Sequence, residues 1–188
     1  MMQKIVKCGL IGGFVLFLWG AISWTVLPWQ GKQIKRFSNE QQVQTAIANN
    51  IDGSGFYVLP NLHQYAKGSD EFESAKARMS QGPFATVAVM AGGKNPCMVC
   101  SMIFDLIVKI IAASLVTWLL LHNSGPHGFK RTVKIVTTIG LIIAIAATLP
   151  YVIWFGFPIG FAITSMIEAV IAWFLAGLAI GKILDKKA

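Results

Sequence analysis

The sequence is poor in charged residues, and acidic residues are the scarcest. Of its 188 residues, 8 are Asp or Glu and 16 are Lys or Arg, so charged side chains make up 13% of the chain. Hydrophobic residues make up 55%, and the mean hydropathy is +0.62. An average soluble domain carries about 25% charged residues. The composition therefore excludes an ordinary soluble domain and predicts a membrane protein.

Cysteine, histidine and the common catalytic motifs are scarce as well. Three cysteines in this length are too few for a disulfide scaffold. His63 has no second His, Cys or acid at metal-ligand spacing, so we expect a surface loop histidine and no metal site. A phosphate-binding glycine loop, a nucleophile elbow and a metalloprotease motif are all missing from the sequence. These absences favour a protein that is not an enzyme.

The positive net charge does not indicate a nucleic-acid partner. The formal net charge is +8, but the Lys and Arg residues lie mainly beside hydrophobic segments and do not gather in one patch. Basic residues flank membrane spans on the cytoplasmic side, which explains this distribution more simply. We therefore expect the lipid bilayer as the main partner, with another membrane protein or a second copy of the chain as further candidates.

Four hydrophobic segments are long enough to cross a bilayer, at residues 8–27, 98–121, 133–152 and 159–183. A helix of about 20 residues spans a hydrocarbon core of about 30 Å. Pro28 is expected to end the first segment, and Pro150 with the aromatic residues after it to close the third. The alternative for the first segment is a secretory signal peptide, with a small-residue cleavage site at 21–23, although its apolar run is long for one.

Small residues predict where the first and last segments pack closely against other helices. Glycine and alanine let two helix backbones approach each other inside a membrane. The pattern occurs twice, at Gly9 and Gly13 and at Ala172, Ala176, Gly177 and Gly181. We expect a helix of the same chain or of a second copy against the later stripe, whereas the earlier pair could equally reflect how common glycine is in membrane helices.

Residues 31–95 form a polar, mixed-charge stretch between the first two segments. Val43, Ile47 and Ile51 recur at helical spacing and predict a helix with a cap near Ser38. A second helix is predicted over 69–79, and strands are predicted over 56–59 and 84–90. Because the stretch is too short for a well-stabilised independent domain, we expect a small α/β lobe that leans on the membrane part.

The basic residues in the short flanks predict the orientation. They are Lys4, Lys7, Lys130, Arg131, Lys134, Lys182, Lys186 and Lys187. The turn at 156–158 has no basic residue, whereas Lys32, Lys35 and Arg36 lie on the opposite flank of the first segment and are an exception. With four spans, both termini fall in the cytoplasm and residues 31–95 fall outside, which in a bacterial inner membrane is the periplasm.

Cys97 and Cys100 form a C-x-x-C pair at the outer start of the second segment, where Asn95 can cap the helix and Pro96 can begin it. A helix start stabilises a thiolate, and an outward-facing compartment can keep such a pair oxidised. The sequence leaves three readings open for this pair. It is a catalytic redox pair, a structural disulfide or a pair of apolar thiols.

This layout of four spans, cytoplasmic ends and an outer C-x-x-C resembles the disulfide-forming quinone reductase family of bacterial inner membranes. The resemblance implies thiol oxidation with quinone as the cofactor. It covers the topology and one motif only. Members of the family pass electrons through a second cysteine pair in the second outer loop, and here that loop, residues 151–161, contains no cysteine. Lys109 also lies too deep to match the basic residue that the family has near its first pair.

Three charged residues fall inside the predicted spans: Asp105, Lys109 and Glu168. Asp105 and Lys109 are four residues apart on one helix face and can pair. Lys109 and Glu168 both lie about 14–15 Å below the outer boundary at 1.5 Å per residue. Because a charge near mid-bilayer costs several kcal/mol unless it is paired, we predict one cluster in the bundle interior. Its surplus acid is expected to be protonated or hydrogen-bonded by Thr164 or Ser165, and the cluster either clamps two helices or forms a proton or ligand site.

The stretches 18–29, 54–60 and 173–179 resemble a group of small bacterial inner-membrane proteins, a likeness that implies a location and no activity. The predicted fold is a mainly α membrane protein, with four transmembrane helices in a bundle and a small α/β periplasmic lobe between helices 1 and 2. Its parts are residues 1–30, 31–95 and 96–188. We expect an accessory or interaction protein that binds a protein partner or a lipid-like ligand. A membrane thiol oxidoreductase and a small proton-coupled transporter are the alternatives.

Overall fold

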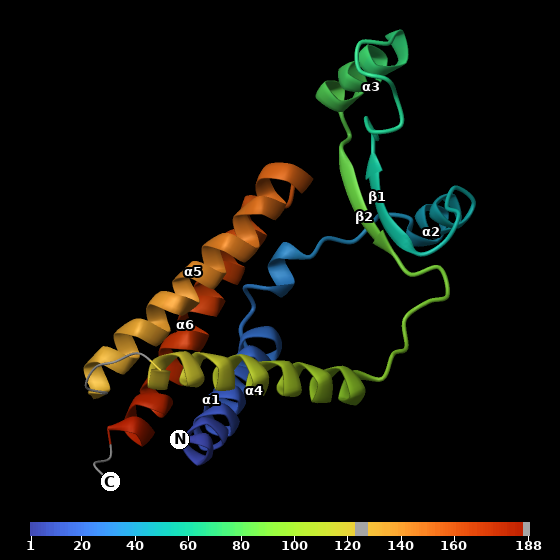
Figure 1. Ribbon diagram of the computed structural model, residues 1–188. Helices are drawn as coiled ribbons and strands as arrows, with labels where there is room; N and C mark the ends of the chain where they lie inside the picture. The colour runs from blue at the N-terminus through green and yellow to red at the C-terminus, as the bar shows by residue number, and fades with distance from the viewer. Residues whose placement is uncertain (123–127, 186–188) are drawn as a thin grey trace. The chain divides into compact units, whose positions relative to one another are not determined.

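The computed structural model describes residues 1–122 and 128–185, so Lys186 and Lys187 lie outside the described residues. The elements in chain order (Figure 1) are α1 (Met2–Thr25), η1 (Gly31–Gln33), α2 (Glu40–Ala48), β1 (Gly55–Leu59), α3 (Asp70–Gln81), β2 (Ala85–Val89), α4 (Met98–His122), α5 (Phe129–Phe155) and α6 (Ile159–Leu184). The chain divides into two compact units. The helical unit is Met1–Ile34, Cys97–Pro150 and Pro158–Ala188, and the lobe unit is Lys35–Pro96 and Tyr151–Phe157.

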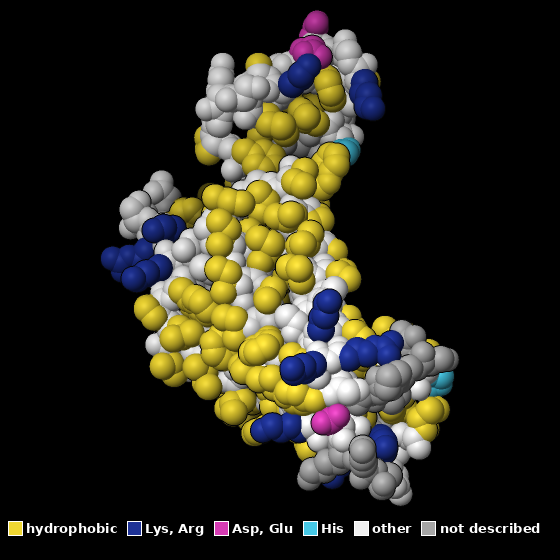
Figure 2. All heavy atoms as spheres, turned by 90° about the vertical axis from the view of Figure 1, so that its left-hand side faces the viewer, with side chains coloured by type: hydrophobic (Ala, Val, Ile, Leu, Met, Phe, Trp, Pro, Cys, Tyr) yellow, Lys and Arg dark blue, Asp and Glu magenta, His cyan; other side chains and the backbone are white. Residues whose placement is uncertain are grey.

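The four predicted hydrophobic segments all form long helices, α1, α4, α5 and α6. Each is long and apolar enough to cross a membrane, with a mean hydropathy of 2.0 to 2.2 over its best window. Many of their large aliphatic side chains are exposed, because the helices are apolar on nearly every side. Figure 2 shows these side chains as a broad hydrophobic field over the long helices. The protein is thus mainly helical, with four candidate membrane spans and a small two-stranded sheet.

Small residues set the packing within the helical unit. A Cβ on Gly12 of α1 would lie 3.2 Å from Ala113 of α4 and 3.0 Å from Ile180 of α6, so these three helices meet closely there. Gly177 of α6 faces Val133 and Val136 of α5. The predicted stripe on α6 therefore packs against a helix of the same chain.

Helix α4 packs mainly through its second half. Its buried residues, Ala113, Val116, Thr117 and Leu120, all lie there. Most of the first half is exposed, with Phe104 at 69% and Val108 at 62%. In Figure 1, α4 runs across the direction of α1, α5 and α6. The expected bundle of four helices packed side by side is thus only partly formed, because a crossing helix meets its neighbours over a limited length.

Helix α5 extends three residues beyond Val152, the predicted end of the third segment. The helix runs to Phe155, with Pro150 inside its last turns. A proline in a helix removes one backbone donor and can be accommodated with a kink. The end comes instead at Gly156, whose φ of +67° is a conformation that glycine adopts without strain.

The lobe unit has the predicted order of helix, strand, helix and strand. The two helices begin at side-chain caps, where Asn39 accepts a hydrogen bond from the Gln42 amide at 2.9 Å and Ser69 accepts one from Phe72 at 3.1 Å. The cap of α2 is therefore Asn39, one residue after the predicted position near Ser38. Both caps satisfy backbone donors that the first turn leaves free.

A two-stranded antiparallel sheet forms the centre of the lobe unit. Strand β1 pairs with β2 in the register Gly55 to Val89, Tyr57 to Val87 and Leu59 to Ala85. The end of α5 belongs to this unit, because the Phe155 ring packs edge-on against Phe56 with centroids 5.1 Å apart. The Thr86 hydroxyl also donates to the Phe155 carbonyl at 3.1 Å. Residues 151–157, which were predicted to belong with the spans, thus cluster with the lobe.

Candidate functional site

A buried glutamine follows the end of α1. Gln30 is 0% exposed, and its Nε2 donates to Oε2 of Glu168 in α6 at 2.6 Å. Its Oε1 is also buried and, among the residues that the structure describes, meets no hydrogen-bond donor. An unsatisfied buried acceptor costs about 1–3 kcal/mol, so it marks a place where a water molecule or a ligand group would be stabilised.

Tryptophan residues hold this segment against α1 and α6. Trp29 Nε1 donates to the Ser23 hydroxyl at 3.0 Å and to the Ser23 carbonyl at 3.2 Å. Trp19 Nε1 donates to the Glu168 carbonyl at 3.2 Å, and the two indole rings meet edge-on with centroids 6.4 Å apart. These bonds fold the chain back after α1, which places the Gln30 amide beside Glu168.

The structure brings Asp105 and Lys109 together on α4. Lys109 Nζ donates to Asp105 Oδ2 at 2.7 Å, with 27% of the lysine side chain and 49% of the aspartate side chain exposed. The lysine Nζ also lies 5.7 Å from the centroid of the Phe17 ring. The Asp105–Lys109 pair therefore faces α1 on one side and remains exposed on the other.

Gly20 of α1 lies between Lys109 and Glu168. A Cβ on Gly20 would be 2.8 Å from Lys109 Nζ and 3.9 Å from Glu168 Oε1. The two charged groups therefore lie near the same point, although they do not form an ion pair within 4.0 Å. The absent glycine side chain leaves space between them. Lys109 and Asp105 of α4, Glu168 of α6 and Gln30, which follows α1, together make up the polar site.

The hydroxyl groups expected to support Glu168 are used or placed differently. Thr164 Oγ1 donates to the carbonyls of Gly160 at 3.1 Å and Phe161 at 3.0 Å, within its own helix. Ser165 is half-buried on α6. The Gln30 side chain donates to Glu168 instead, because a helical hydroxyl reaches the carbonyl one turn earlier more easily than a carboxylate one turn later. Sequence reasoning missed Gln30, since it lies outside the four predicted spans, after Pro28.

Cys97 and Cys100 are joined by a disulfide at the start of α4. Their Cα atoms are 5.4 Å apart, and the Cys100 amide donates to Cys97 Sγ at 3.3 Å. Cys100 is exposed, so the bond is open to attack by a thiolate. The third cysteine, Cys8, is a free thiol buried in α1. Within residues 1–122 and 128–185, no group of three His, Cys, Asp or Glu side chains could hold a metal ion.

The lobe unit contains an apolar groove between α2 and the two strands, which we call the lobe groove. It has a volume of about 460 Å³. Val43 and Ile47 of α2 form one wall with Ile51, which lies beyond the helix end, and Val58, Leu59, Ala85, Val87 and Val89 form the other. The Tyr57 hydroxyl, at its edge, donates to the Gly53 carbonyl at 2.8 Å. The lobe groove is therefore an open surface of mainly aliphatic character.

Four apolar helices of this length are compatible with an integral membrane protein. Comparison with known proteins finds no matching family model, no matching curated protein and no matching solved structure. The functional proposals below therefore rest on the residues and geometry of the chain itself.

Proposed function

We propose that the protein is a multi-pass protein of the bacterial inner membrane, with both termini cytoplasmic and the lobe unit in the periplasm. The positions of the basic residues support this. Lys4 and Lys7 are at the start of α1, Lys130 at the start of α5 and Lys182 in the last turn of α6. The turn between α5 and α6 has none. The cytoplasmic flanks of membrane spans carry this excess of positive charge.

Reporter fusions test the orientation. Alkaline phosphatase fused after residue 67, in the lobe, is expected to be active because it folds only in the periplasm. The same enzyme fused after residue 185 is expected to be inactive. The reverse pattern would contradict the proposed orientation.

Within the membrane the protein acts as an accessory protein, not an enzyme, and binds a protein partner through the lobe groove. The observation that carries this function is an aliphatic groove left open on a part of the chain outside the four spans. Leu59, which lines it, is 63% exposed. Exposed apolar surface of this kind is typical of interaction sites, and an amphipathic helix or strand of a partner would fill it.

A photo-crosslinking amino acid at Ile47, inside the lobe groove, tests this function in living cells. The matched control is Gln44, which lies on the same helix and is exposed outside the groove. The expected result is one discrete protein adduct from position 47 and none from position 44. A further Val87→Asp substitution, on the opposite wall, should abolish that adduct. A lipid adduct, or equal labelling at both positions, would contradict a protein partner.

The disulfide favours a second candidate function, a membrane thiol oxidoreductase. In this reaction a partner dithiol would be oxidised by exchange with the Cys97–Cys100 disulfide. Cys97 and Cys100 would then be a dithiol, and two electrons and two protons would pass to a quinone, giving the quinol. Thiol trapping in cells with and without respiratory quinone tests this function. A disulfide that stays oxidised in both would exclude it.

The unsatisfied acceptor of Gln30 favours a third candidate, proton-coupled transport through the polar site. Glu168 would carry the proton, since it is the acidic group beside the buried amide. The test is proton uptake into vesicles that contain the purified protein, compared with the Glu168→Gln variant. Equal uptake by both would exclude this role.

A further inference from the structure

We propose that a groove between α5 and α6 binds an anionic glycerophospholipid, with the phosphate at Lys130 and Lys134 and an acyl chain along the groove. This α5–α6 groove has a volume of about 430 Å³. It lies in the helical unit and takes a lipid, so it goes beyond the partner site proposed for the lobe.

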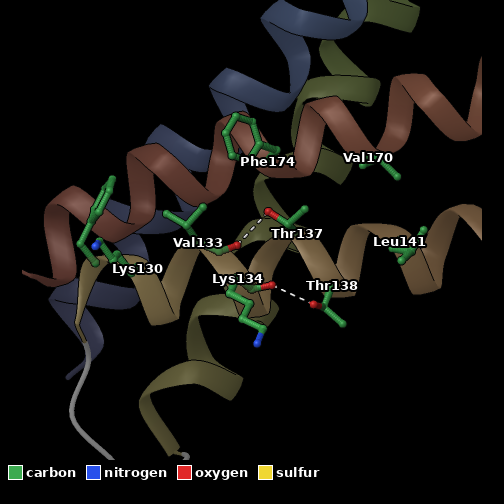
Figure 3. A pocket seen from close by; sticks show the side chains of 9 residues that line it. Lys130, Val133, Lys134, Thr137, Thr138, Leu141, Val170 and Phe174 are labelled. Carbon is green, nitrogen blue, oxygen red and sulfur yellow. Dashed lines mark hydrogen bonds between the residues drawn. The ribbon is translucent and has the colours of Figure 1, made fainter.

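The walls of the α5–α6 groove are apolar and come from both helices. Val133 and Leu141 line it from α5, and Val170 and Phe174 line it from α6 (Figure 3). Phe174 is 42% exposed and Leu141 is 47% exposed, so the groove opens onto the outer surface of the helices. In a bilayer that surface faces lipid, and an acyl chain is the component that fills such a groove.

The charge of the α5–α6 groove is concentrated at one end. Lys130 and Lys134 are one helical turn apart at the start of α5, and both are exposed. The ion pairs formed within the described part of the chain join Lys76 to Glu73 and Lys109 to Asp105, so neither groove lysine has an acidic partner there. The Asp185 carboxylate at this end accepts from the Phe129 amide at 3.1 Å. The two exposed ammonium groups beside an apolar channel complement a phosphate attached to hydrocarbon.

The threonines of the α5–α6 groove reinforce this polarity. Thr137 Oγ1 donates to the Val133 carbonyl at 2.8 Å, and Thr138 Oγ1 donates to the Lys134 carbonyl at 2.9 Å (Figure 3). Their protons are therefore used within the helix, and the hydroxyl oxygens present only lone pairs to a ligand. Because these hydroxyls offer no hydrogen-bond donor to an anion, a phosphate would not be stabilised deeper in the groove. The phosphate therefore stays at the lysine end.

The length of the α5–α6 groove suits one leaflet. Lys134 and Leu141 are seven residues apart, which corresponds to about 10 Å along the helix. One leaflet contributes about 15 Å to the hydrocarbon core, so the groove can hold much of one acyl chain. Anionic headgroups gather at the cytoplasmic leaflet, and basic pockets between membrane helices on that side bind them. Inorganic phosphate lacks the chain that the apolar walls require.

Native mass spectrometry of the full chain tests the site, with phosphatidylglycerol and phosphatidylcholine of identical acyl chains as probes. We expect a retained phosphatidylglycerol that phosphatidylcholine and inorganic phosphate do not displace. Each lysine near an anionic headgroup contributes about 1 kcal/mol, so Lys130→Gln/Lys134→Gln should weaken phosphatidylglycerol binding roughly 30-fold. The control Lys4→Gln/Lys7→Gln loses the same charge from α1 and should bind as the unmodified protein does.

Two further variants keep the test decisive if the double glutamine variant is poorly folded. Lys130→Arg/Lys134→Arg keeps the charge and should retain the lipid. Leu141→Trp fills the apolar end and should release it, whereas Leu115→Trp, on an exposed position of α4, should not. Any one of three results would overturn the proposal. These are equal retention of the two lipids, equal effects of the two glutamine double variants, and no effect of Leu141→Trp on lipid binding.

Discussion

The Gln30 side chain, from the segment that follows α1, donates through Nε2 to Oε2 of Glu168 in α6 at 2.6 Å. The two residues are 138 positions apart in the chain, and one of them is completely buried. The bond therefore fastens the chain after α1 to the last helix, and it gives a carboxylate inside a candidate membrane span a polar partner.

We expect Gln30 and Glu168 to be energetically coupled. A hydrogen bond to a charged group contributes about 1.5–3 kcal/mol, so Gln30→Leu and Glu168→Leu should each destabilise the protein by about that amount. The double variant should lose less than the sum, because each single change leaves one polar partner unsatisfied. Thermal unfolding of the four proteins in one detergent gives the coupling free energy. A coupling of zero would mean that the two side chains act independently.

Three glycine-to-alanine changes should form a graded series. Gly31→Ala is expected to be neutral, since no atom lies within 4 Å of its added Cβ. Gly20→Ala should destabilise slightly, because the Cβ would lie 2.8 Å from Nζ at the end of the flexible Lys109 side chain. Gly13→Ala should be the most destabilising, by about 1–3 kcal/mol, because it meets the backbone of Ile110. Thermal unfolding ranks the three, and any other order contradicts this packing.

Lys109 is expected to contribute more to the stability of the protein when Asp105 is present. Lys109→Met leaves the Asp105 carboxylate without its cation, whereas Lys109→Met/Asp105→Leu removes both charges. Breaking a buried pair costs about 3–5 kcal/mol, and the partial exposure of this pair reduces the expected loss to about 1–2 kcal/mol. The double variant should recover most of that loss. Unfolding in lipid nanodiscs measures the difference, and a double variant that is less stable than the single one would refute the pairing.

The disulfide predicts a specific labelling pattern. Unfolded, unreduced protein should take up one maleimide-polyethylene glycol, at Cys8, whereas reduced protein should take up three. Folded protein should resist labelling at Cys8, which is 0% exposed. Gel mobility shifts provide the count. Cys97→Ala/Cys100→Ala is the control and should take up one label in either state, while three labels on unreduced unmodified protein would show that the thiols are free.

Local sequence was sufficient for the elements whose formation depends on nearby residues. Long, mainly apolar runs predicted α1, α4, α5 and α6, because helix length and hydrophobicity depend only on consecutive side chains. The spacing of Val43 and Ile47 predicted the apolar face of α2, and Ser69 begins α3 as a cap. The small-residue stripe at Gly177 and Gly181 predicted a close helix contact.

The polar site was only partly accessible to such reasoning. Asp105 and Lys109 could be paired from their spacing of four residues, since that spacing fixes one helix face. Lys109 and Glu168 were also predicted to lie at the same depth below the outer membrane boundary and so to approach each other. In the structure both lie beside Gly20. Gln30 could not be found in this way, because its burial depends on the return of the chain after α1. No local pattern encodes that return.

The sequence by itself thus determined the four candidate spans, the order of the lobe elements and the charged residues within the apolar segments. The tertiary structure decided that α4 packs mainly through its second half, that α5 passes Pro150 and that Gln30 meets Glu168. The physical reason is the range of the interactions. Hydrophobic runs and caps depend on residues within a few positions, whereas crossing angles and buried hydrogen bonds depend on which distant segments meet.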